Sequence, residues 1–364
     1  MDLTKAPLSL NSVISGEQIA NELKVLLGEK IILTFKARTD GSNLRKMITN
    51  ILSKNVSIVA DEKSYKILPL KGKGIPRLLA VLADTYIVTS GKSYNLQVWN
   101  RIPNSSSPLV IYTNGDFITA KDIRLILVKI DMNNFTIDSI ITMSPQYIKE
   151  HFGEFGKPTI KSQLLISAIE RDKIIKNGGV FFNSDSIRMS KHTNKQYIKP
   201  HYKSDDPPTN DMLLSLDVIK EIVAEKLIGK KLEDSDTKTK GQTLERIVID
   251  LLGYSSNSKL VGGYPDIPNQ LLEVKVQDTQ TVDLGKYSPQ YEEPTDYSNF
   301  TTFDVRYLIA FTNPKSHIIE GLILSNGEAL GQTFTYVSDK SYKCQRSIPM
   351  DFFEKYSGKS LFNP

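Results

Sequence analysis

The chain has 364 residues, of which 40% are hydrophobic and 24% charged, and its formal net charge is +5. This composition is typical of a globular protein of about two domains and excludes the disordered and fibrous classes. No apolar run reaches the roughly 18 residues of a membrane span. The single cysteine, Cys344, excludes an intrachain disulfide and a cysteine-based zinc site. Because the N-terminus also lacks the layout of a signal peptide, we expect a cytoplasmic protein with a slight preference for polyanions.

The first half of the chain mixes helix and strand patterns, without βαβ repetition and without a visible internal repeat. A capping box at Ser15–Gln18 predicts a helix over 12–28, and the charged stretch 44–53 predicts another. Ile31–Phe35 has the composition of a buried strand. The remaining patterns predict strands at 85–89, 109–112 and 123–130, with Asn114-Gly115 as the turn between the last two. They also predict a short helix at 75–82 and helical structure from 144 to 176.

Cations gather in two stretches of this half. Lys36, Arg38 and Arg45 lie on a turn that leads into a helix, and Lys191 and Lys195 lie in an acid-free stretch interleaved with tyrosines. Such residues suit contacts with DNA phosphates or base edges. Solvated surface charge explains both stretches as well.

A polar stretch with two prolines, Asp205–Asn210, is the best candidate for a domain boundary. We therefore expect an N-terminal domain over 1–206, with a possible subdivision near 140, and a C-terminal domain over 207–364. In the second domain, helices are predicted at 212–227 and 241–253, and strands at 306–312, 319–324 and 334–337. The class expected is α/β, of the mixed α+β kind.

The C-terminal domain is organised around residues 262–277. Pro268-Asn269 is a turn signal between apolar-rich runs, which predicts a tight strand–turn–strand. Side chains two apart on a strand share a face, so Glu273 and Lys275 lie together while the intervening residues face the core. Hairpin pairing brings Asp266 beside Glu273. Two carboxylates and an ammonium then converge, which suits a divalent metal and an activated water.

These residues resemble the motif of the PD-(D/E)xK nuclease superfamily. Pro265-Asp266 and Glu273-Val274-Lys275 carry the resemblance, together with Glu245 on the preceding helix. The likeness covers roughly residues 240–325, and the chain as a whole looks like a type II restriction endonuclease. It implies a C-terminal core with a mixed central sheet flanked by helices, and a separate N-terminal α/β domain that recognises DNA. Glu-x-Lys alone is common, as Glu22-Leu-Lys24 shows, so the setting of the motif carries the argument.

The resemblance implies Mg²⁺-dependent hydrolysis of phosphodiester bonds in double-stranded DNA at a specific sequence. Asp266 and Glu273, with the backbone carbonyl of Val274, are then the expected metal ligands. Lys275 orients or deprotonates the water, or neutralises charge on the phosphorus. Glu245 supports a second metal, hydrogen-bonds Lys275, or is simply a solvated helix residue. Lys286, in the long loop after the catalytic strand, is a further candidate for DNA contact.

Several alternatives remain open at this stage. A DNA repair nuclease or junction resolvase would use the same fold, and a non-catalytic, sequence-specific DNA-binding protein would use the hairpin only structurally. Restriction enzymes are commonly homodimers because their sites are two-fold symmetric. The resemblance further implies a cognate DNA methyltransferase in the same cell, although not as a bound partner.

Overall fold

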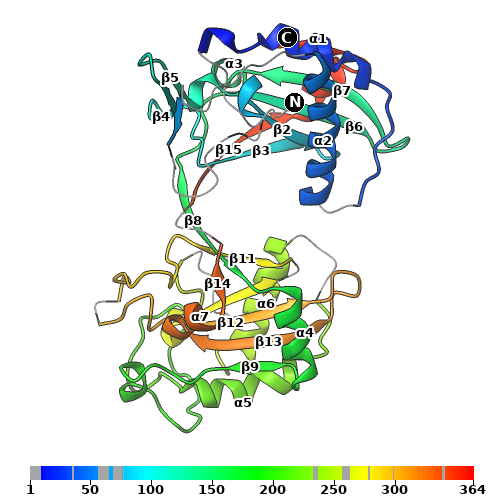
Figure 1. Ribbon diagram of the computed structural model, residues 1–364. Helices are drawn as coiled ribbons and strands as arrows, with labels where there is room; N and C mark the ends of the chain where they lie inside the picture. Colours follow the sequence, from blue (N-terminus) through cyan, green and yellow to red (C-terminus); the bar gives the residue numbers. More distant parts are fainter. Residues whose placement is uncertain are drawn as a thin grey trace. The chain divides into compact units, whose positions relative to one another are not determined.

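The computed structural model describes residues 10–34, 37–55, 65–68, 76, 78–232, 237–255, 263–277, 279–297, 299–337 and 341–364. The chain divides into two compact units (Figure 1): unit 1 comprises Met1–Ile160 and Lys340–Pro364, and unit 2 comprises Lys161–Asp339. This division differs from the expected boundary at 206/207. Residues 161–206 belong to unit 2 because strand β9 (Val180–Phe182) pairs inside its sheet, and the C-terminal segment belongs to unit 1 because strand β16 (Ser360–Phe362) pairs there.

The central sheet of unit 2 has the strand order β10–β12–β13–β9. Strand β10 (Leu272–Gln277) runs parallel to β12 (Arg306–Thr312), β12 is antiparallel to β13 (Ile319–Asn326), and β13 is parallel to β9. A mixed sheet of mainly apolar strands needs cover on both faces. The predicted strands at 306–312 and 319–324 are confirmed.

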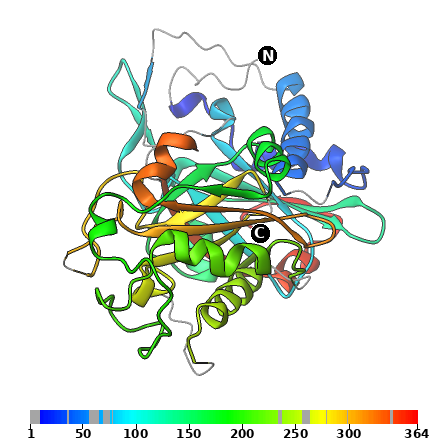
Figure 2. The same ribbon diagram turned by 90° about the horizontal axis from the view of Figure 1, so that it is seen from below.

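Helices cover both faces of this sheet (Figure 2). Helices α5 (Leu216–Leu227) and α6 (Thr237–Leu251) share one buried apolar cluster with alternate residues of β10, β12 and β13. Helices α4 (Ala168–Lys176) and α7 (Gly327–Thr333) share another cluster with the opposite face. That second cluster also includes β8 (Thr159–Leu165) and β11 (Thr281–Gly285), which pair antiparallel; β14 (Thr335–Tyr336) pairs with β8 as well.

The main sheet of unit 1 has the order β16–β7–β6–β2. Strand β2 (Ala83–Val88) runs parallel to β6 (Arg124–Asp131), β6 is antiparallel to β7 (Thr136–Met143), and β7 is parallel to β16. Helices α1 (Gly16–Leu23) and α2 (Ala37–Asn55) pack on one face through a shared apolar cluster. The opposite face packs with α3 (Pro145–Phe152) and α8 (Met350–Lys355).

Unit 1 also contains two smaller strand groups. Strand β3 (Ser93–Trp99) pairs antiparallel with β15 (Ser341–Pro349). Strands β1 (Tyr65–Ile67), β4 (Pro108–Tyr112) and β5 (Phe117–Thr119) form a small antiparallel sheet. The predicted Asn114-Gly115 turn therefore joins β4 to β5 and not to the strand at 124–131.

Two expectations for this half were wrong. The strand expected at 31–35 does not form over residues 31–34, where the backbone makes no strand ladder. Next to this segment, Lys30 makes an isolated bridge to Thr136, and the Ile32 side chain is exposed. The helical stretch expected at 144–176 contains β8 between α3 and α4, since apolar residues at its centre alternate into a sheet instead of following a helical face. No helix among the described residues is long and apolar enough to cross a membrane.

Candidate active site

A short turn positions the predicted acidic residues at the start of β10. The strand–turn–strand expected over 266–276 is instead a 3-10 turn, Pro268–Gln270, closed by Leu271 in the left-handed region at φ 44°. Only one antiparallel bridge, between Ile267 and Leu272, joins its two ends. Proline at the first position of the turn supplies the required φ, which explains why a turn signal was visible in the sequence. Its consequence matches the expectation: the chain reverses and Asp266 returns beside β10.

Buried polar contacts hold this turn in place. The Gln270 side-chain amide donates to the Met212 carbonyl at 2.7 Å, and its oxygen accepts from the Leu214 amide at 3.0 Å. The Arg306 guanidinium, fully buried, donates to the carbonyls of Leu214 and Gln270. Arg306 is therefore a structural residue at the start of β12 and takes no part in a DNA-contacting surface.

Asp266, Glu273 and Lys275 meet at the start of this edge strand. The Lys275 Nζ lies 3.2 Å from Asp266 Oδ2 and forms an ion pair with Glu273 Oε1. The Asp266 amide donates to Glu273 Oε2 at 2.9 Å. The predicted convergence of two carboxylates and one ammonium is therefore present in the fold, and the Glu273 side chain is only 5% exposed.

Val274 lies between the two motif residues and contributes its backbone. Its amide donates to Asp266 Oδ2 at 2.9 Å. In a β-strand the N–H and C=O of one residue point to the same side. The Val274 carbonyl therefore points away from β12, toward the side of the strand where Asp266 lies, as a metal ligand at this position would require. The Val274 side chain packs into the core beneath α5 and α6.

Glu245 approaches the same acidic cluster from helix α6. The residue is 8% exposed, and its Oε1 has no hydrogen-bond partner among the described residues. Burial and, to a lesser extent, the nearby Asp266 raise the pKa of its carboxyl to about 7, although Lys275 and Arg246 oppose the shift. Glu245 is thus a buried acid beside the site, and its interpretation as a solvated helix residue is wrong.

The cluster contains three carboxyls and one ammonium, and burial shifts their pKa values. Burial raises the pKa of Glu273, and its contact with Lys275 lowers it only in part. For Lys275, burial alone would lower the pKa, but the two neighbouring carboxylates outweigh it and the pKa is raised. Lys275 therefore stays protonated. Burial thus favours the protonated forms of Glu245 and Glu273, and a divalent cation that displaced these protons would compensate the negative charge of the carboxylates.

The donor set fits a hard cation. Among the described residues no three His, Cys, Asp or Glu side chains converge as a ready-made metal site. Mg²⁺, however, is usually held by one or two carboxylates, with waters and substrate oxygens completing its shell. Asp266 and Glu273 supply two carboxylates, and the Val274 carbonyl can add a neutral oxygen. The unpartnered Glu245 oxygen is a further hard donor beside them.

An aromatic group connects the site to Lys286. The rings of Tyr264 and Tyr287 stack at 5.1 Å between centroids, and Tyr264 shares a 2.7 Å hydrogen bond with the Tyr307 hydroxyl. The exposed Lys286 Nζ lies 4.7 Å from the Tyr287 ring centroid. Because Tyr264 lies two residues before Asp266, Lys286 is the predicted DNA-contact residue that the fold connects most directly to the acidic cluster.

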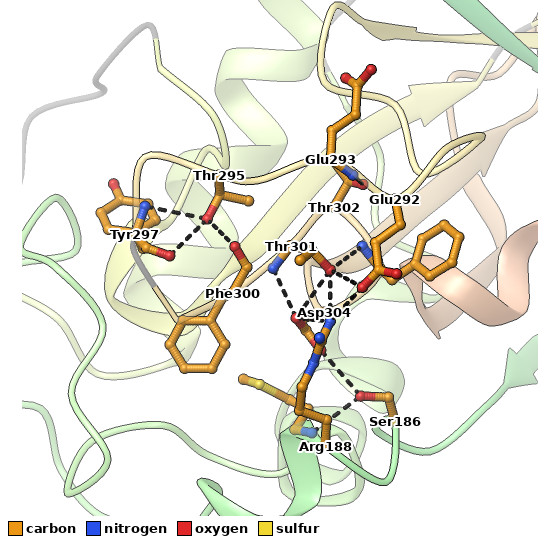
Figure 3. A network of polar contacts seen from close by, with 12 residues as sticks. Ser186, Arg188, Glu292, Glu293, Thr295, Tyr297, Phe300, Thr301, Thr302 and Asp304 are labelled. Carbon is orange, nitrogen blue, oxygen red and sulfur yellow. Dashed lines mark hydrogen bonds and ion pairs between the residues drawn. The ribbon is translucent and has the colours of Figure 1, made fainter.

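A second polar network fixes the loop between β11 and β12 (Figure 3). The Arg188 guanidinium donates two hydrogen bonds to the Asp304 carboxylate, from Nε to Oδ1 at 2.9 Å and from Nη2 to Oδ2 at 2.5 Å. The same guanidinium reaches Glu292 and the hydroxyl of Thr301. Asp304 is 1% exposed and also accepts from the Thr301 amide. Asp304 therefore anchors the loop. The sequence did not reveal its bidentate pair with Arg188, because the two residues lie far apart along the chain.

The other predicted DNA-contact residues that the structure describes lie on elements other than those of the acidic cluster. Lys191 and Lys195 are exposed on the connection between β9 and α5 in unit 2. Arg45 is half-buried on α2 in unit 1. Lys36 and the side chain of Arg38 lie outside the described residues. Tyr264 and Arg188 are site-supporting residues that the sequence analysis did not identify, because each acts through tertiary contacts.

Comparison with known proteins adds no relative: no family model, no curated protein and no solved structure matches this chain.

Proposed function

We propose that unit 2 is a Mg²⁺-dependent endonuclease that hydrolyses phosphodiester bonds in double-stranded DNA at a specific sequence, as a type II restriction endonuclease does. One observation carries the proposal. The Lys275 ammonium contacts the carboxylates of both Asp266 and Glu273 where strand β10 begins, which is the constellation that the PD-(D/E)xK motif requires.

Each residue of the cluster has a role in this proposal. Asp266 and Glu273, with the Val274 carbonyl, hold the cation. When bound, Mg²⁺ lowers the pKa of a water and polarises the scissile phosphate. Lys275 acts as a charged donor and not as a base, because its neighbours raise its pKa. It orients the attacking water and stabilises the negative charge that develops on the phosphate oxygens.

The choice of DNA as substrate rests on less specific features. The net charge of +5 favours a polyanion, and the exposed Lys286 lies on the loop next to the cluster. A repair nuclease or junction resolvase with the same residues would share the chemistry and differ in how the substrate is selected. The test must therefore separate discrete cutting from unspecific cutting.

The first test of this proposal is incubation of the full chain with long duplex DNA of known sequence, with Mg²⁺ or with EDTA. We expect discrete fragments that require Mg²⁺. Lys275→Ala and Asp266→Ala should each lower the cleavage rate by at least about 100-fold, because each removes a group that acts on the transition state or holds the cation. Lys226→Ala and Asp250→Ala, at exposed positions on α5 and α6, are the matched controls.

Other outcomes would replace the proposal. Metal-dependent degradation without discrete bands would favour the repair-type nuclease. Intact DNA in every lane, together with a sequence-specific gel shift that persists in Asp266→Ala, would favour the non-catalytic DNA-binding protein.

A further inference from the structure

The two units have the same strand pairing. In unit 2, β10 is parallel to β12, β12 antiparallel to β13, and β13 parallel to β9. In unit 1, β2 is parallel to β6, β6 antiparallel to β7, and β7 parallel to β16. Each sheet has a pair of helices on one face, α5 and α6 or α1 and α2. The agreement extends from topology to individual residues.

The turn that enters the first strand is the same in both units. The 3-10 turn Leu79–Val81 is closed by Leu82 at φ 49°, as Pro268–Gln270 is closed by Leu271 at φ 44°. The Arg124 amide donates to the Leu82 carbonyl at 2.7 Å, and the Arg306 amide donates to the Leu271 carbonyl at 2.8 Å. An isolated antiparallel bridge also joins the residues that flank each turn, Leu78 to Ala83 in unit 1 and Ile267 to Leu272 in unit 2.

The far ends of the sheets also match in register. When residues are counted from the equivalent positions Arg124 and Arg306, Ser144 corresponds to Asn326. The side-chain oxygen of each accepts from the backbone amide three residues further on and so caps the helix that follows. In the last parallel pair, Val180 lies opposite Leu322 as Ser360 lies opposite Ile140. The next link is the same as well: the amides of Asn183 and Asn363 donate to the carbonyls of Leu324 and Thr142 at 2.9 and 3.0 Å.

This register identifies the position in unit 1 that corresponds to the candidate active site. Asp84 occupies the position of Glu273, and Tyr86 occupies the position of the catalytic lysine, Lys275. In the sequence, Arg77 stands where Asp266 stands, two residues before the 3-10 turn; its placement lies outside the described residues. Unit 1 thus retains one acid of the motif and lacks its lysine.

The retained acid is neutralised by protein groups. The Arg101 guanidinium forms an ion pair with Asp84 Oδ2, and the Tyr86 hydroxyl donates to the same oxygen at 3.0 Å. Both charged side chains are largely buried, at 10% and 13% exposure. Unit 2 leaves three carboxyls around one ammonium, whereas in unit 1 an arginine and a hydroxyl already satisfy the single aspartate.

We propose that unit 1 is a catalytically silent copy of unit 2, in which the Asp84–Arg101 pair replaces the cation site, so that each chain has one divalent-cation centre. The inference rests on the proposed function of unit 2. It has a direct consequence: one chain cuts one DNA strand at a time, and cutting both strands takes two chains or two consecutive events.

The test is a titration of the full chain with Mn²⁺, followed through the electron paramagnetic resonance signal of the free ion, in the absence of DNA. We expect one bound Mn²⁺ per chain. Glu273→Gln should abolish this binding, and Asp84→Asn should leave it unchanged. Because Asp84→Asn unpairs a buried arginine, the double variant Asp84→Asn/Arg101→Gln provides a neutral pair in case the single variant does not fold. Asp250→Ala controls for unspecific surface binding.

Two failures of this prediction are distinguishable. Two bound Mn²⁺ per chain, one lost in Glu273→Gln and the other in Asp84→Asn, would overturn the silent copy and leave the proposed function of unit 2 intact. No bound Mn²⁺, or binding that Glu273→Gln does not change, would overturn the single centre together with the cation site proposed for unit 2.

Discussion

Glu245 is the acid that the surrounding fold accommodates least well. It is buried on α6, one of its oxygens has no hydrogen-bond partner among the described residues, and Asp266 adds repulsion. Such a group destabilises the fold when it ionises unless a cation or a partner is supplied. Destabilising residues of this kind are typical of functional sites, where binding compensates for the cost.

This environment makes stability depend on pH in a defined direction. The pKa of Glu245 is about 7 in the folded chain, above its ordinary value of 4.5. The folded chain therefore retains a proton that the unfolded chain releases, and stability falls as pH rises from about 4.5 to 7. Glu245→Gln cannot ionise, so its free energy of unfolding should equal that of the parent near pH 4 and exceed it by up to about 3 kcal/mol above pH 7.

Urea unfolding in EDTA across this pH range measures the effect. Glu221→Gln, at an exposed position on α5, serves as the control and should show no such trend. If the difference in free energy of unfolding between Glu245→Gln and the parent stayed constant with pH, Glu245 would not be a buried acid with a raised pKa.

Arg306 illustrates a purely structural charge at the same scale. Its side chain is fully buried, donates to two carbonyls, and lies 3.7 Å from the Asp185 carboxylate. Arg306→Met would leave those carbonyls and the carboxylate unpaired, and should lower the free energy of unfolding by about 3–5 kcal/mol. Chemical denaturation measures it, with Lys315→Met at an exposed turn as control. A loss below about 1 kcal/mol would show that water replaces the guanidinium.

At the scale of elements, the helix that follows the third central strand begins in the same way in both units. Ser144 caps α3 and Asn326 caps α7, each through a side-chain oxygen that accepts a backbone amide. Asn326 also donates to the Ser184 carbonyl at 2.6 Å, so its side chain links α7 to the segment after β9. Equivalent caps at equivalent positions indicate that the strand-to-helix junction is a conserved feature of both copies of the fold.

We expect Ser144→Ala to lower the free energy of unfolding by about 1 kcal/mol, the usual value of a cap. Each variant also loses a second hydrogen bond, from Asn363 to Ser144 at 3.2 Å or from Asn326 to the Ser184 carbonyl at 2.6 Å. Asn326→Ala should cost more, about 2 kcal/mol, because its second bond is the shorter one. Thermal or urea unfolding compares the two variants, with Asn50→Ala at an exposed position of α2 as control. Equal losses in the two variants would mean that the bond to Ser184 contributes no more than the bond from Asn363 to Ser144.

At the scale of the whole molecule, the chain consists of two repeats that exchange a segment. The first repeat runs from α1 to β9 and the second from α5 to β16, with the matching elements in the same order. The last strand–helix–strand of each repeat belongs to the other unit: β8, α4 and β9 to unit 2, and β15, α8 and β16 to unit 1. Each unit is therefore completed by the other half of the chain.

This exchange predicts that a cut between the repeats leaves the halves associated. A protease site inserted between the exposed residues Lys195 and Gln196 separates the repeats covalently. After cleavage the two fragments should elute together in size-exclusion chromatography and separate only in denaturant, because each one holds strands of both sheets. Two separate native peaks would show that the pairings of β9 with β13 and of β16 with β7 are too weak to hold the chain together.

The sequence by itself determined the local features. The alternation of β10 sets Glu273 and Lys275 on one face, the turn signal returns Asp266 to them, and the apolar strands at 306–312 and 319–324 follow from composition. These succeed because they depend on residues a few positions apart, whose periodicity the backbone geometry fixes.

The tertiary structure decided the rest. The domain boundary, the strand inside the expected helical stretch 144–176, the Arg188–Asp304 anchor and the burial of Glu245 all depend on partners more than a few residues away, which periodicity does not encode. The repeat shows the same limit: strand pairing preserves a register while side chains such as Asp84 and Glu273, or Tyr86 and Lys275, diverge. Pairing depends on the backbone, whereas chemistry depends on the side chains, so only the fold reveals that the two halves are copies.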